Sequence, residues 1–303
     1  MNPSRLCMGT LTLSPLQKDV PAEEAALLME YAFRSGITFF DTAELYANYS
    51  FFKELWKLGV PRGDIVVSTK CYAYSRETAE RSLDKALREM NTDYIDIFLL
   101  HEQESVHTLR GHAEAIDTFW KYKEQGVIGS IGISTHYVAG VKAACNDERL
   151  HVIHPIINVA GIGIVDGTTS DMIAAMEEAK KKGKFLFAMK ALGGGHLLKR
   201  YREALEFILS LRCVDALAVG MASKSEIDAN VQAVLHNRLP TKAVESRKRI
   251  FIEPYCVGCG KCVRRCQHGA LSLQNNKAVV DHSRCVLCSY CVTACADFYI
   301  KVI

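Results

Sequence analysis

The sequence of 303 residues predicts an α/β protein, a (β/α)8 TIM barrel followed by a small cysteine-rich domain. Two observations support this prediction. Short apolar segments alternate with stretches of helical period over roughly the first 235 residues, as in repeated strand–helix units. Eight of the twelve cysteines lie in the last fifth of the chain, in two regular runs. An open doubly wound sheet would have about five or six strands and a G-x-G-x-x-G turn after the first, and no such turn follows the first segment here.

The expected strands are apolar runs, several of which end in a polar residue. In chain order they are Leu6–Leu11, Ile37–Phe40, Ile65–Thr69, Tyr94–Leu100, Ile128–Ile133, Val152–Val159, Phe185–Met189 and Ala216–Gly220. This number of strands, each followed by a connecting segment, matches a closed parallel barrel.

The expected helices lie between these strands, and several have acidic residues early and Lys or Arg late, as the helix dipole favours. They include Ala22–Ser35, Arg76–Met90, His112–Gln125, Asp171–Lys182, Arg202–Leu211 and Ser225–Leu235. We therefore expect the barrel to span residues 1–237. Residues 238–250 contain Pro240 and charges without periodicity, so we expect a linker there, leading to a domain over residues 251–303.

Composition limits the possible classes of protein. With 49% apolar and 23% charged residues, the chain resembles an ordinary globular protein that buries a full core. The longest nearly uncharged stretch, Ile156–Val165, is about half the length that crosses a bilayer. The N-terminus has no signal-peptide core with a cleavage site. We therefore expect a cytoplasmic protein without membrane contact.

The two cysteine runs share one spacing, C-x2-C-x2-C-x3-C. The first run is Cys256, Cys259, Cys262 and Cys266, and the second is Cys285, Cys288, Cys291 and Cys295. Closely spaced thiolates of this kind wrap corners of an iron–sulfur cubane. A pair of zinc sites is the alternative, but zinc motifs rarely use four cysteines in so tight a run and do not need it duplicated.

This C-terminal module resembles the bacterial-type ferredoxin fold with two [4Fe–4S] clusters. In such ferredoxins the fourth cysteine of each run binds the other cluster. The resemblance implies that Cys256, Cys259, Cys262 and Cys295 hold one cluster, and that Cys285, Cys288, Cys291 and Cys266 hold the other. The sequence departs from the pattern after each fourth cysteine, where Gln267 and Ala296 replace the usual Pro.

Positive charge is concentrated around these cysteines. Between His236 and Ile303 there are eleven Lys and Arg residues against four Asp and Glu. Two interpretations stay open: the basic residues offset the negative charge of the clusters, or they form a docking patch for an acidic electron carrier such as a ferredoxin or flavodoxin. Nucleic acid is not an expected partner, because no aromatic side chains are interleaved with the basic ones.

Ionisable residues stand at the ends of three consecutive expected strands. Asp41 follows ITFF, Lys70 follows IVVST and His101 follows YIDIFLL, and Tyr46 lies five residues after Asp41. A single residue of this kind is more often satisfied by a neighbour and has no catalytic role. Because active sites of barrels lie at the carboxyl ends of the strands, several such residues together predict an active site.

Here the sequence resembles the aldo-keto reductase superfamily, through FFDTAELY, STK and LLH, over nearly the whole barrel. The resemblance implies a catalytic tetrad of Asp41, Tyr46, Lys70 and His101 that acts on a small carbonyl-type substrate. Tyr46 would be the proton donor. Lys70, held charged by Asp41, would stabilise the tyrosinate. His101 would orient the carbonyl by hydrogen bonding.

The same resemblance implies an NAD(P) site. Ser134, in GISTHY, and Gly220, Ser223 and Asn230, in and around GMASKSEIDAN, match the family's cofactor-binding positions. Three positions depart from the family: Glu226 replaces an Arg for the 2′-phosphate, His154 replaces a Gln, and Met189 replaces an aromatic residue. An acid near the ribose favours NAD over NADP, or no nicotinamide at all. Gly193–Gly195 suits either a pyrophosphate contact or a flexible lid.

A barrel of this kind joined to a two-cluster module resembles a branch of predicted aldo-keto-reductase-like oxidoreductases. We expect an iron–sulfur oxidoreductase that reduces, or reversibly oxidises, a small carbonyl-type substrate with electrons from clusters, nicotinamide or both. Nicotinamide moves two electrons and a cluster one, and no flavin motif is evident to connect them. The alternatives are an electron-transfer or redox-sensing protein with the barrel as binding platform, and an NAD(P)-dependent reductase with structural clusters.

Overall fold

The computed structural model describes residues 3–239, 249–295 and 299–302. Eight parallel strands close into a barrel in sequence order. They are β1 (Leu6–Gly9), β2 (Phe39–Asp41), β3 (Val66–Cys71), β4 (Ile95–Leu100), β5 (Ile128–Thr135), β6 (Val152–Pro155), β7 (Phe185–Met189) and β8 (Ala216–Gly220). The barrel closes by pairing of β1 with β8, where Gly9 lies opposite Gly220. The predicted barrel is therefore confirmed.

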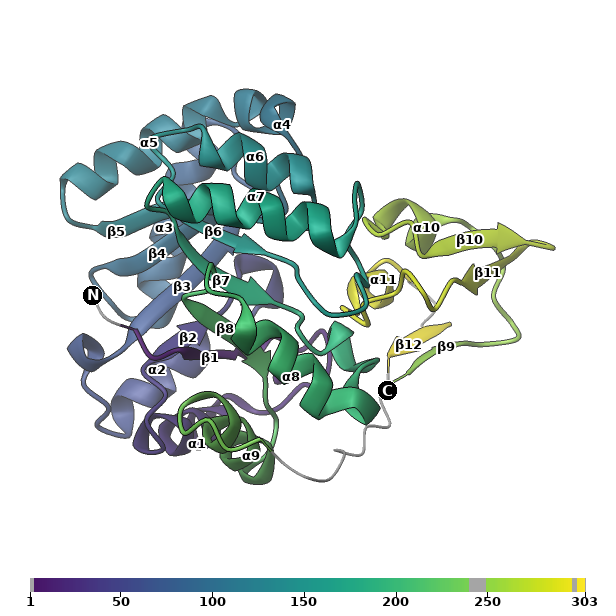
Figure 1. Cartoon of the computed structure of the whole chain (residues 1–303), viewed down its shortest axis with the longest axis horizontal. Coiled ribbons are helices and arrows are strands. Elements are labelled where there is room, and N and C mark those ends of the chain that lie inside the picture. The colour runs from purple at the N-terminus through teal and green to yellow at the C-terminus, as the bar shows by residue number, and fades with distance from the viewer. Residues whose placement is uncertain (1–2, 240–248, 296–298, 303) are drawn as a thin grey trace.

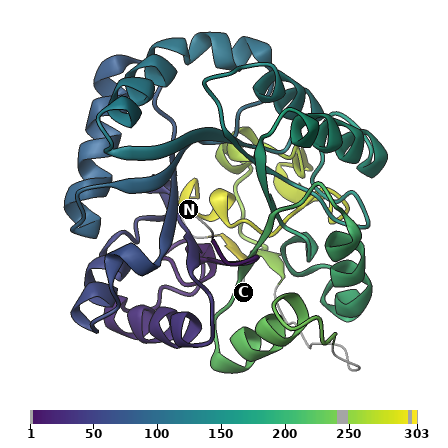
Figure 2. The same ribbon diagram turned by 60° about the vertical axis from the view of Figure 1, so that its left-hand side comes forward.

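Helices form a ring around the strands (Figure 2). They are α1 (Ala22–Arg34), α2 (Ser50–Lys57), α3 (Arg76–Met90), α4 (Val106–Gly111), α5 (Ala113–Glu124), α6 (Val138–Cys145), α7 (Thr169–Lys181), α8 (Tyr201–Ser210) and α9 (Lys224–Val234). Short 3-10 helices are η1 (Thr10–Thr12), η2 (Glu44–Tyr46), η3 (Arg62–Asp64), η4 (Gly193–Gly195) and η5 (Leu198–Arg200). The sequence did not predict α2, α4 and α6, which have only six to eight residues each.

Two expected strands end earlier than predicted. The run from Leu6 to Leu11 leaves the sheet after Gly9, because Thr10 begins the 3-10 helix η1. The run from Val152 to Val159 leaves it after Pro155, and the apolar residues beyond it lie buried in a loop at the barrel mouth. An apolar run therefore indicates burial here, and the strand itself is shorter.

Alternation along each strand divides the barrel residues between two cores. Phe39, Leu99 and Phe187 belong to the cluster inside the barrel, whereas Phe98 and Leu100 pack outward against the helices. Both faces of each strand are thus apolar, which explains why the strands read as nearly continuous hydrophobic runs. Most ionisable residues of the site lie near the carboxyl ends of the strands, which form the mouth.

Several helices begin at a residue whose side chain caps them. Ser75 accepts a hydrogen bond from the backbone N–H of Thr78 at the start of α3, and Thr168 accepts one from Asp171 at the start of α7. Such caps satisfy backbone donors that have no partner inside the helix. They fix where each helix starts after the loop that leaves the barrel mouth.

The C-terminal module is built from two small antiparallel sheets and two short helices. These are β9 (Ile250–Ile252) paired with β12 (Ile300–Val302), β10 (Leu271–Gln274) paired with β11 (Lys277–Val280), α10 (Lys261–Arg265) and α11 (Tyr290–Thr293). The module lies at one end of the barrel, with α11 on the side nearest to it (Figure 1). Most of the expected linker, residues 240–248, lies outside the described residues. In the part of the chain that is described, no helix is long and apolar enough to span a membrane.

Candidate active site and cluster cavities

A buried ion pair lies at the bottom of the barrel mouth. The ammonium group of Lys70, in β3, donates to Oδ1 and Oδ2 of Asp41 at 2.8 and 2.7 Å and to the carbonyl oxygen of Thr42 at 2.6 Å. Lys70 is 1% exposed and Asp41 4%. Because an ammonium group has three protons, these contacts use the hydrogen-bonding capacity of Lys70 in full.

Tyr46 is the last residue of η2 and reaches the same place from the loop after β2. The loop turns sharply there, since Ala47 has a positive φ of 51°. Nζ of Lys70 lies 5.3 Å from the centre of the Tyr46 ring. Burial, followed by the charge of Asp41, raises the pKa of Tyr46 well above its usual value. Its phenol therefore keeps its proton at neutral pH, as a proton donor must.

His101 follows β4 directly and stands beside Tyr46. Its backbone N–H donates to the carbonyl oxygen of Cys71 at 2.7 Å, and its ring stacks on Tyr72 at 4.7 Å. Burial and the charge of Lys70 lower the pKa of His101 well below its usual value, so the imidazole is neutral. Its Nε2 lies 3.5 Å from the hydroxyl of Tyr290, in the C-terminal module. The structure thus brings the four predicted tetrad residues together.

A second polar group at the mouth was not predicted. It consists of Glu102, His136 and Lys190, which follow β4, β5 and β7. Nζ of Lys190 lies 2.8 Å from Nε2 of His136, and Nδ1 of His136 lies 3.8 Å from Oε1 of Glu102. Glu102 and Lys190 both have positive φ, 55° and 59°. Their positions after strands are the signal that revealed the tetrad, and the same signal was present for them.

The positions expected to bind a dinucleotide have partners inside the barrel. The Ser134 hydroxyl accepts a hydrogen bond from the backbone N–H of Glu102 at 2.9 Å. The Asn230 amide donates to the carbonyl oxygen of Glu226 at 2.8 Å and accepts from the Tyr201 hydroxyl at 3.0 Å. Through these contacts Ser134 and Asn230 stabilise the barrel domain itself.

Backbone N–H groups at the start of α9 also have hydrogen-bond partners within the protein. Ser223 caps the helix by accepting from the N–H of Glu226 at 3.2 Å, and Oε2 of Glu226 accepts from the N–H of Ala222 at 2.7 Å. Phosphates bind at helix N-termini through free N–H groups. A carboxylate already occupies this one and would repel a phosphate. At Gly220 a Cβ would lie 2.2 Å from Oγ1 of Thr12, so packing against η1 explains this glycine.

The glycine triplet contacts the C-terminal module. A Cβ on Gly194 would lie 1.9 Å from the carbonyl oxygen of Val286, and a Cβ on Gly163 would lie 2.4 Å from Cγ1 of Val286. Val286 is only 2% exposed. The two glycines therefore let the module's backbone approach the barrel closely. The module occupies the space beside the triplet, and with Glu226 at α9 these residues do not fit a bound dinucleotide.

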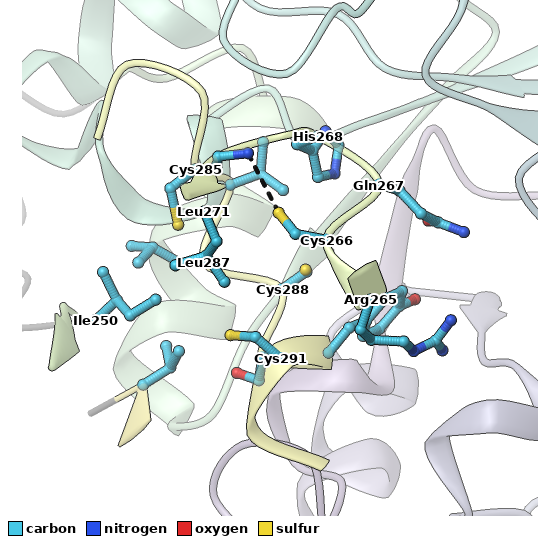
Figure 3. A pocket seen from close by; sticks show the side chains of 15 residues that line it. Ile250, Arg265, Cys266, Gln267, His268, Leu271, Cys285, Leu287, Cys288 and Cys291 are labelled. Carbon is cyan, nitrogen blue, oxygen red and sulfur yellow. Dashed lines mark hydrogen bonds between the residues drawn. The ribbon is translucent and has the colours of Figure 1, made fainter. Parts of the chain in front are cut away.

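Two cavities in the module are each lined by four cysteines. The first has Cys266 from the first run with Cys285, Cys288 and Cys291 from the second (Figure 3). The other has Cys256, Cys259 and Cys262 with Cys295 from the second run. We call the first the inner cavity, because its Cys288 packs near the tetrad, and the second the outer cavity, because its Cys259 is exposed. In each cavity, three cysteines of one run are joined by the fourth cysteine of the other run, as in the ferredoxin ligation pattern.

The donor sets of both cavities suit iron–sulfur clusters. Both cavities are partly open to solvent. Backbone N–H groups point at cysteine sulfurs, from Ala270 to Cys266 at 3.3 Å and from Tyr299 to Cys295 at 3.2 Å. Such hydrogen bonds to sulfur are among the features that tune cluster potentials. Within the described residues no three His, Cys, Asp or Glu side chains converge as the ligands of a single metal ion do.

The inner cavity adjoins the tetrad directly. Cys288 and Tyr290 pack with Tyr46 and Ala43 in one small apolar cluster. The Arg265 guanidinium lies 5.4 Å from the centre of the Tyr290 ring. Tyr290 was not predicted as a site residue, since it is 189 residues away from His101 in the chain and lies within a cysteine run.

A closed barrel with a tetrad of this kind defines an oxidoreductase of the aldo/keto reductase class. Residues 5–205 match the model of the aldo/keto reductase family, and the chain belongs to this family. Residues 255–297 match the 4Fe-4S dicluster domain. The chain is therefore an aldo-keto reductase oxidoreductase with an iron–sulfur ferredoxin-like domain at its C-terminal end.

Individual relatives agree with this assignment. The chain is 27% identical over 271 residues to L-galactose dehydrogenase of Arabidopsis thaliana, covering 76% of this chain and 84% of the relative. It is 26% identical over 141 residues to the methylglyoxal reductase DkgA of Yersinia pestis, covering 43% and 50%. Among solved structures, an aldo-keto reductase of Pseudomonas aeruginosa has the same fold, with a TM-score of 0.66, 24% identity and 77% and 91% coverage.

Proposed function

We propose that the protein reduces an electron-poor carbonyl compound, with electrons from its iron–sulfur clusters and a proton from Tyr46. The observation that carries this proposal is the packing of Cys288 against the small cluster that contains Tyr46. A cluster held by Cys288 would lie next to the carbonyl that Tyr46 protonates. Electrons could then pass from this cluster to the substrate without an intermediate carrier.

The electron count favours a particular class of carbonyl. Conversion of a carbonyl to an alcohol takes two electrons and two protons, and reduced [4Fe–4S] clusters supply electrons singly, at potentials within about −700 to +450 mV. An isolated ketone holds one added electron poorly, whereas a carbonyl conjugated with another carbonyl or a double bond delocalises it. We therefore expect 1,2-dicarbonyls, enones or quinones as substrates. Methylglyoxal, after which the Yersinia pestis relative is named, is a 1,2-dicarbonyl.

The residues of the site supply the protons and hold the oxygen. Tyr46 is protonated at rest and gives its proton to the carbonyl oxygen as negative charge develops there. His101 is neutral and directs Nε2 to the same point, so it orients that oxygen. For a 1,2-dicarbonyl the second proton, drawn from water, goes to the other oxygen, and the resulting enediol tautomerises to a hydroxycarbonyl. The positive charge of Lys70 stabilises the tyrosinate that remains.

The residues expected to bind a dinucleotide form hydrogen bonds within the protein instead. This favours the clusters over nicotinamide as the electron source. Ser134 and Asn230 are engaged within the barrel, and Glu226 carries a carboxylate at the helix end where a phosphate would bind. We therefore propose that the protein works without NAD(P)H. The alternative with purely structural clusters predicts that NAD(P)H alone supports full turnover.

An acidic electron carrier is the proposed partner, and the outer cavity is its proposed docking place. Cys259 is exposed at this cavity, and Val257 beside it is 63% exposed. Lys261, Arg264 and Lys277 surround the same loop and are exposed. An apolar centre with a basic rim complements an acidic carrier such as a ferredoxin or flavodoxin. Electrons would enter at the outer cavity and leave at the inner one.

The test is a reoxidation experiment under anaerobic conditions. The clusters are reduced with titanium(III) citrate, the excess is removed, and methylglyoxal, menadione or acetone is added without NAD(P)H. We expect methylglyoxal or menadione to reoxidise the clusters, seen by visible absorbance, with matching loss of the carbonyl compound. Acetone is the unconjugated control and should leave the clusters reduced.

The Tyr46→Phe variant separates chemistry in the site from direct reaction with the clusters. If it reoxidises as fast as the wild type, the site is bypassed and the proposal fails. Clusters that stay reduced with every carbonyl while NADH or NADPH alone sustains turnover would support the alternative with structural clusters.

A further inference from the structure

Tyr290 of the C-terminal module reaches into the tetrad. Its hydroxyl lies 3.5 Å from Nε2 of His101 and is hydrogen-bonded to Tyr46. One oxygen atom therefore contacts both side chains that would hold the oxygen of a carbonyl substrate. A proton donor and an orienting group must both lie within hydrogen-bond reach of the reacting oxygen. The position of the Tyr290 hydroxyl is thus the position that a substrate oxygen needs.

We propose that Tyr290 is a built-in occupant of the substrate's oxygen position, and that substrate binds when this side chain withdraws. The inference rests on the proposed function, because it takes Tyr46 and His101 as the groups that bind the carbonyl. It adds that the module controls entry to the site as well as supplying electrons.

The burial of the tetrad supports this. With Tyr290 in place, His101 is 3% exposed and Tyr46 6%, and Tyr290 itself is 6% exposed. The Tyr290 ring packs against Tyr46, Ala43 and Cys288. A substrate that reaches Tyr46 must therefore displace the ring of Tyr290.

The backbone position of Tyr290 ties this movement to the module. It is the first residue of α11, between Cys288 and Cys291, and Ser289 before it has a positive φ of 70°. A non-glycine residue in this region is conformationally strained, and such strain is often found at functional sites. Rotation of the Tyr290 side chain would expose the tetrad next to the inner cavity and would leave the cavity's ligands Cys288 and Cys291 in place. Water would be excluded until substrate takes the place of the ring.

The first test measures access to Tyr46 without turnover. Wild type, Tyr290→Ala and Tyr255→Ala are treated with N-acetylimidazole under anaerobic conditions, and acetylation of Tyr46 is followed by peptide mass spectrometry. We expect about tenfold faster acetylation in Tyr290→Ala, since the ring and a hydrogen bond to Tyr46 are removed. Tyr255 is a tyrosine of the same module that is 78% exposed, so Tyr255→Ala should behave as wild type. Equal iron content in the three proteins shows that the module is intact.

The second test uses phenol as a probe of the vacated space. Phenol has the shape of the lost side chain, so we expect it to bind to Tyr290→Ala and to slow acetylation of Tyr46 again. Tyr290→Phe keeps the ring and should stay close to wild type in acetylation. Equal acetylation of Tyr46 in wild type and Tyr290→Ala, with phenol without effect, would overturn the inference.

Kinetics with a reducible carbonyl distinguish an occupant from a binding group. An occupant that competes with substrate raises KM, so Tyr290→Ala should lower KM about tenfold without loss of kcat. A lower kcat or a higher KM would show that Tyr290 assists the reaction, contrary to the proposal. The acetylation and phenol results do not depend on turnover. They can therefore support the occupant role even if carbonyl reduction by the clusters fails.

Discussion

The carbonyl oxygen of Val286 lies so close to Gly194 that a Cβ on Gly194 would be 1.9 Å from it. This contact joins the loop after β7 to the loop that carries the cysteines of the inner cavity. Gly194 also has a positive φ of 70°. The glycine triplet, which the sequence left open between a pyrophosphate contact and a lid, thus lies where the module docks.

Gly194→Ala should therefore loosen the module from the barrel. The clash with Val286 cannot be relieved by rotating a flexible side chain, because the backbone itself is in the way. We expect faster proteolysis between barrel and module and slower reoxidation of the clusters by a carbonyl. Gly183→Ala is the matched control, since Gly183 has a similar φ of 78° and no atom within 4 Å of its added Cβ. If both variants behave alike, backbone strain explains the effect and the contact does not.

Cys266→Ser should damage the inner site and spare the outer one. Cys266 belongs to the first run but lines the cavity of the second. We expect iron to fall from about eight to about four or five atoms per chain, with the remaining cluster signal being the one that Cys295→Ser removes. Iron analysis and electron paramagnetic resonance check this. A Cys266→Ser protein that loses the same signal as Cys259→Ser would contradict the crossed ligation.

The fold could be predicted from the sequence, because strands that are buried on both faces are continuous apolar runs. Phe185–Met189 and Ala216–Gly220 were predicted with the bounds that the structure has. Helices α2 and α6 were missed, since eight residues give too few turns for a clear period. The end of β6 was misplaced because burial of the following loop has the same apolar signature as a strand.

The site could be predicted only in part, because some of its residues come together only through packing of the module on the barrel. Asp41, Lys70 and His101 lie at or directly after the carboxyl ends of strands, and barrel topology alone brings such residues together. Tyr290 depends on how the module packs on the barrel, which no local pattern encodes. The partners of Glu226 likewise depend on the turn before α9, so the sequence could indicate its unusual charge but not its hydrogen bond to Ala222.

Tyr46→Phe should lower turnover by at least about 10²-fold, the usual contribution of a general acid. Burial raises the pKa of the Tyr46 phenol, so it holds the proton that a phenyl ring lacks. Steady-state rates with a reducible carbonyl and the cluster content of each protein are the measurements. Tyr94→Phe removes a hydroxyl near the start of β4, away from the mouth, and should retain the wild-type rate. Wild-type turnover in Tyr46→Phe would mean that another group is the acid.

Lys70→Met should destabilise the barrel as well as lower turnover. It leaves the Asp41 carboxylate buried without its cation, and removal of one partner from a buried ion pair typically costs about 3–5 kcal/mol. The double variant Asp41→Asn/Lys70→Met removes both charges and should recover much of this free energy of unfolding, but not turnover. Anaerobic urea unfolding followed by circular dichroism measures the difference. A double variant no more stable than Lys70→Met would show that the charge on Asp41 is not the cause.

Charge reversal around the outer cavity should slow reduction by an acidic carrier. Lys261 and Arg264 lie on α10, beside exposed Cys259, so Lys261→Glu/Arg264→Glu turns the basic rim acidic. Attraction between a basic patch and an acidic partner speeds association and weakens with salt. We expect reduction of the clusters by a reduced flavodoxin, followed by stopped flow at low salt, to be at least about tenfold slower, with most of the difference gone at high salt.

A matched control places two equal charge changes away from the module. Arg81 and Lys121 are exposed on α3 and α5, which belong to the ring of helices around the barrel and are labelled well away from α10 in Figure 1. Arg81→Glu/Lys121→Glu changes the net charge as much, so it should leave the rate within about twofold of wild type if local attraction decides the rate. Titanium(III) citrate, a small reductant, should still reduce the clusters of both variants in full. Equal slowing by both double variants would mean that net charge, rather than the surface at the outer cavity, governs the approach of the carrier.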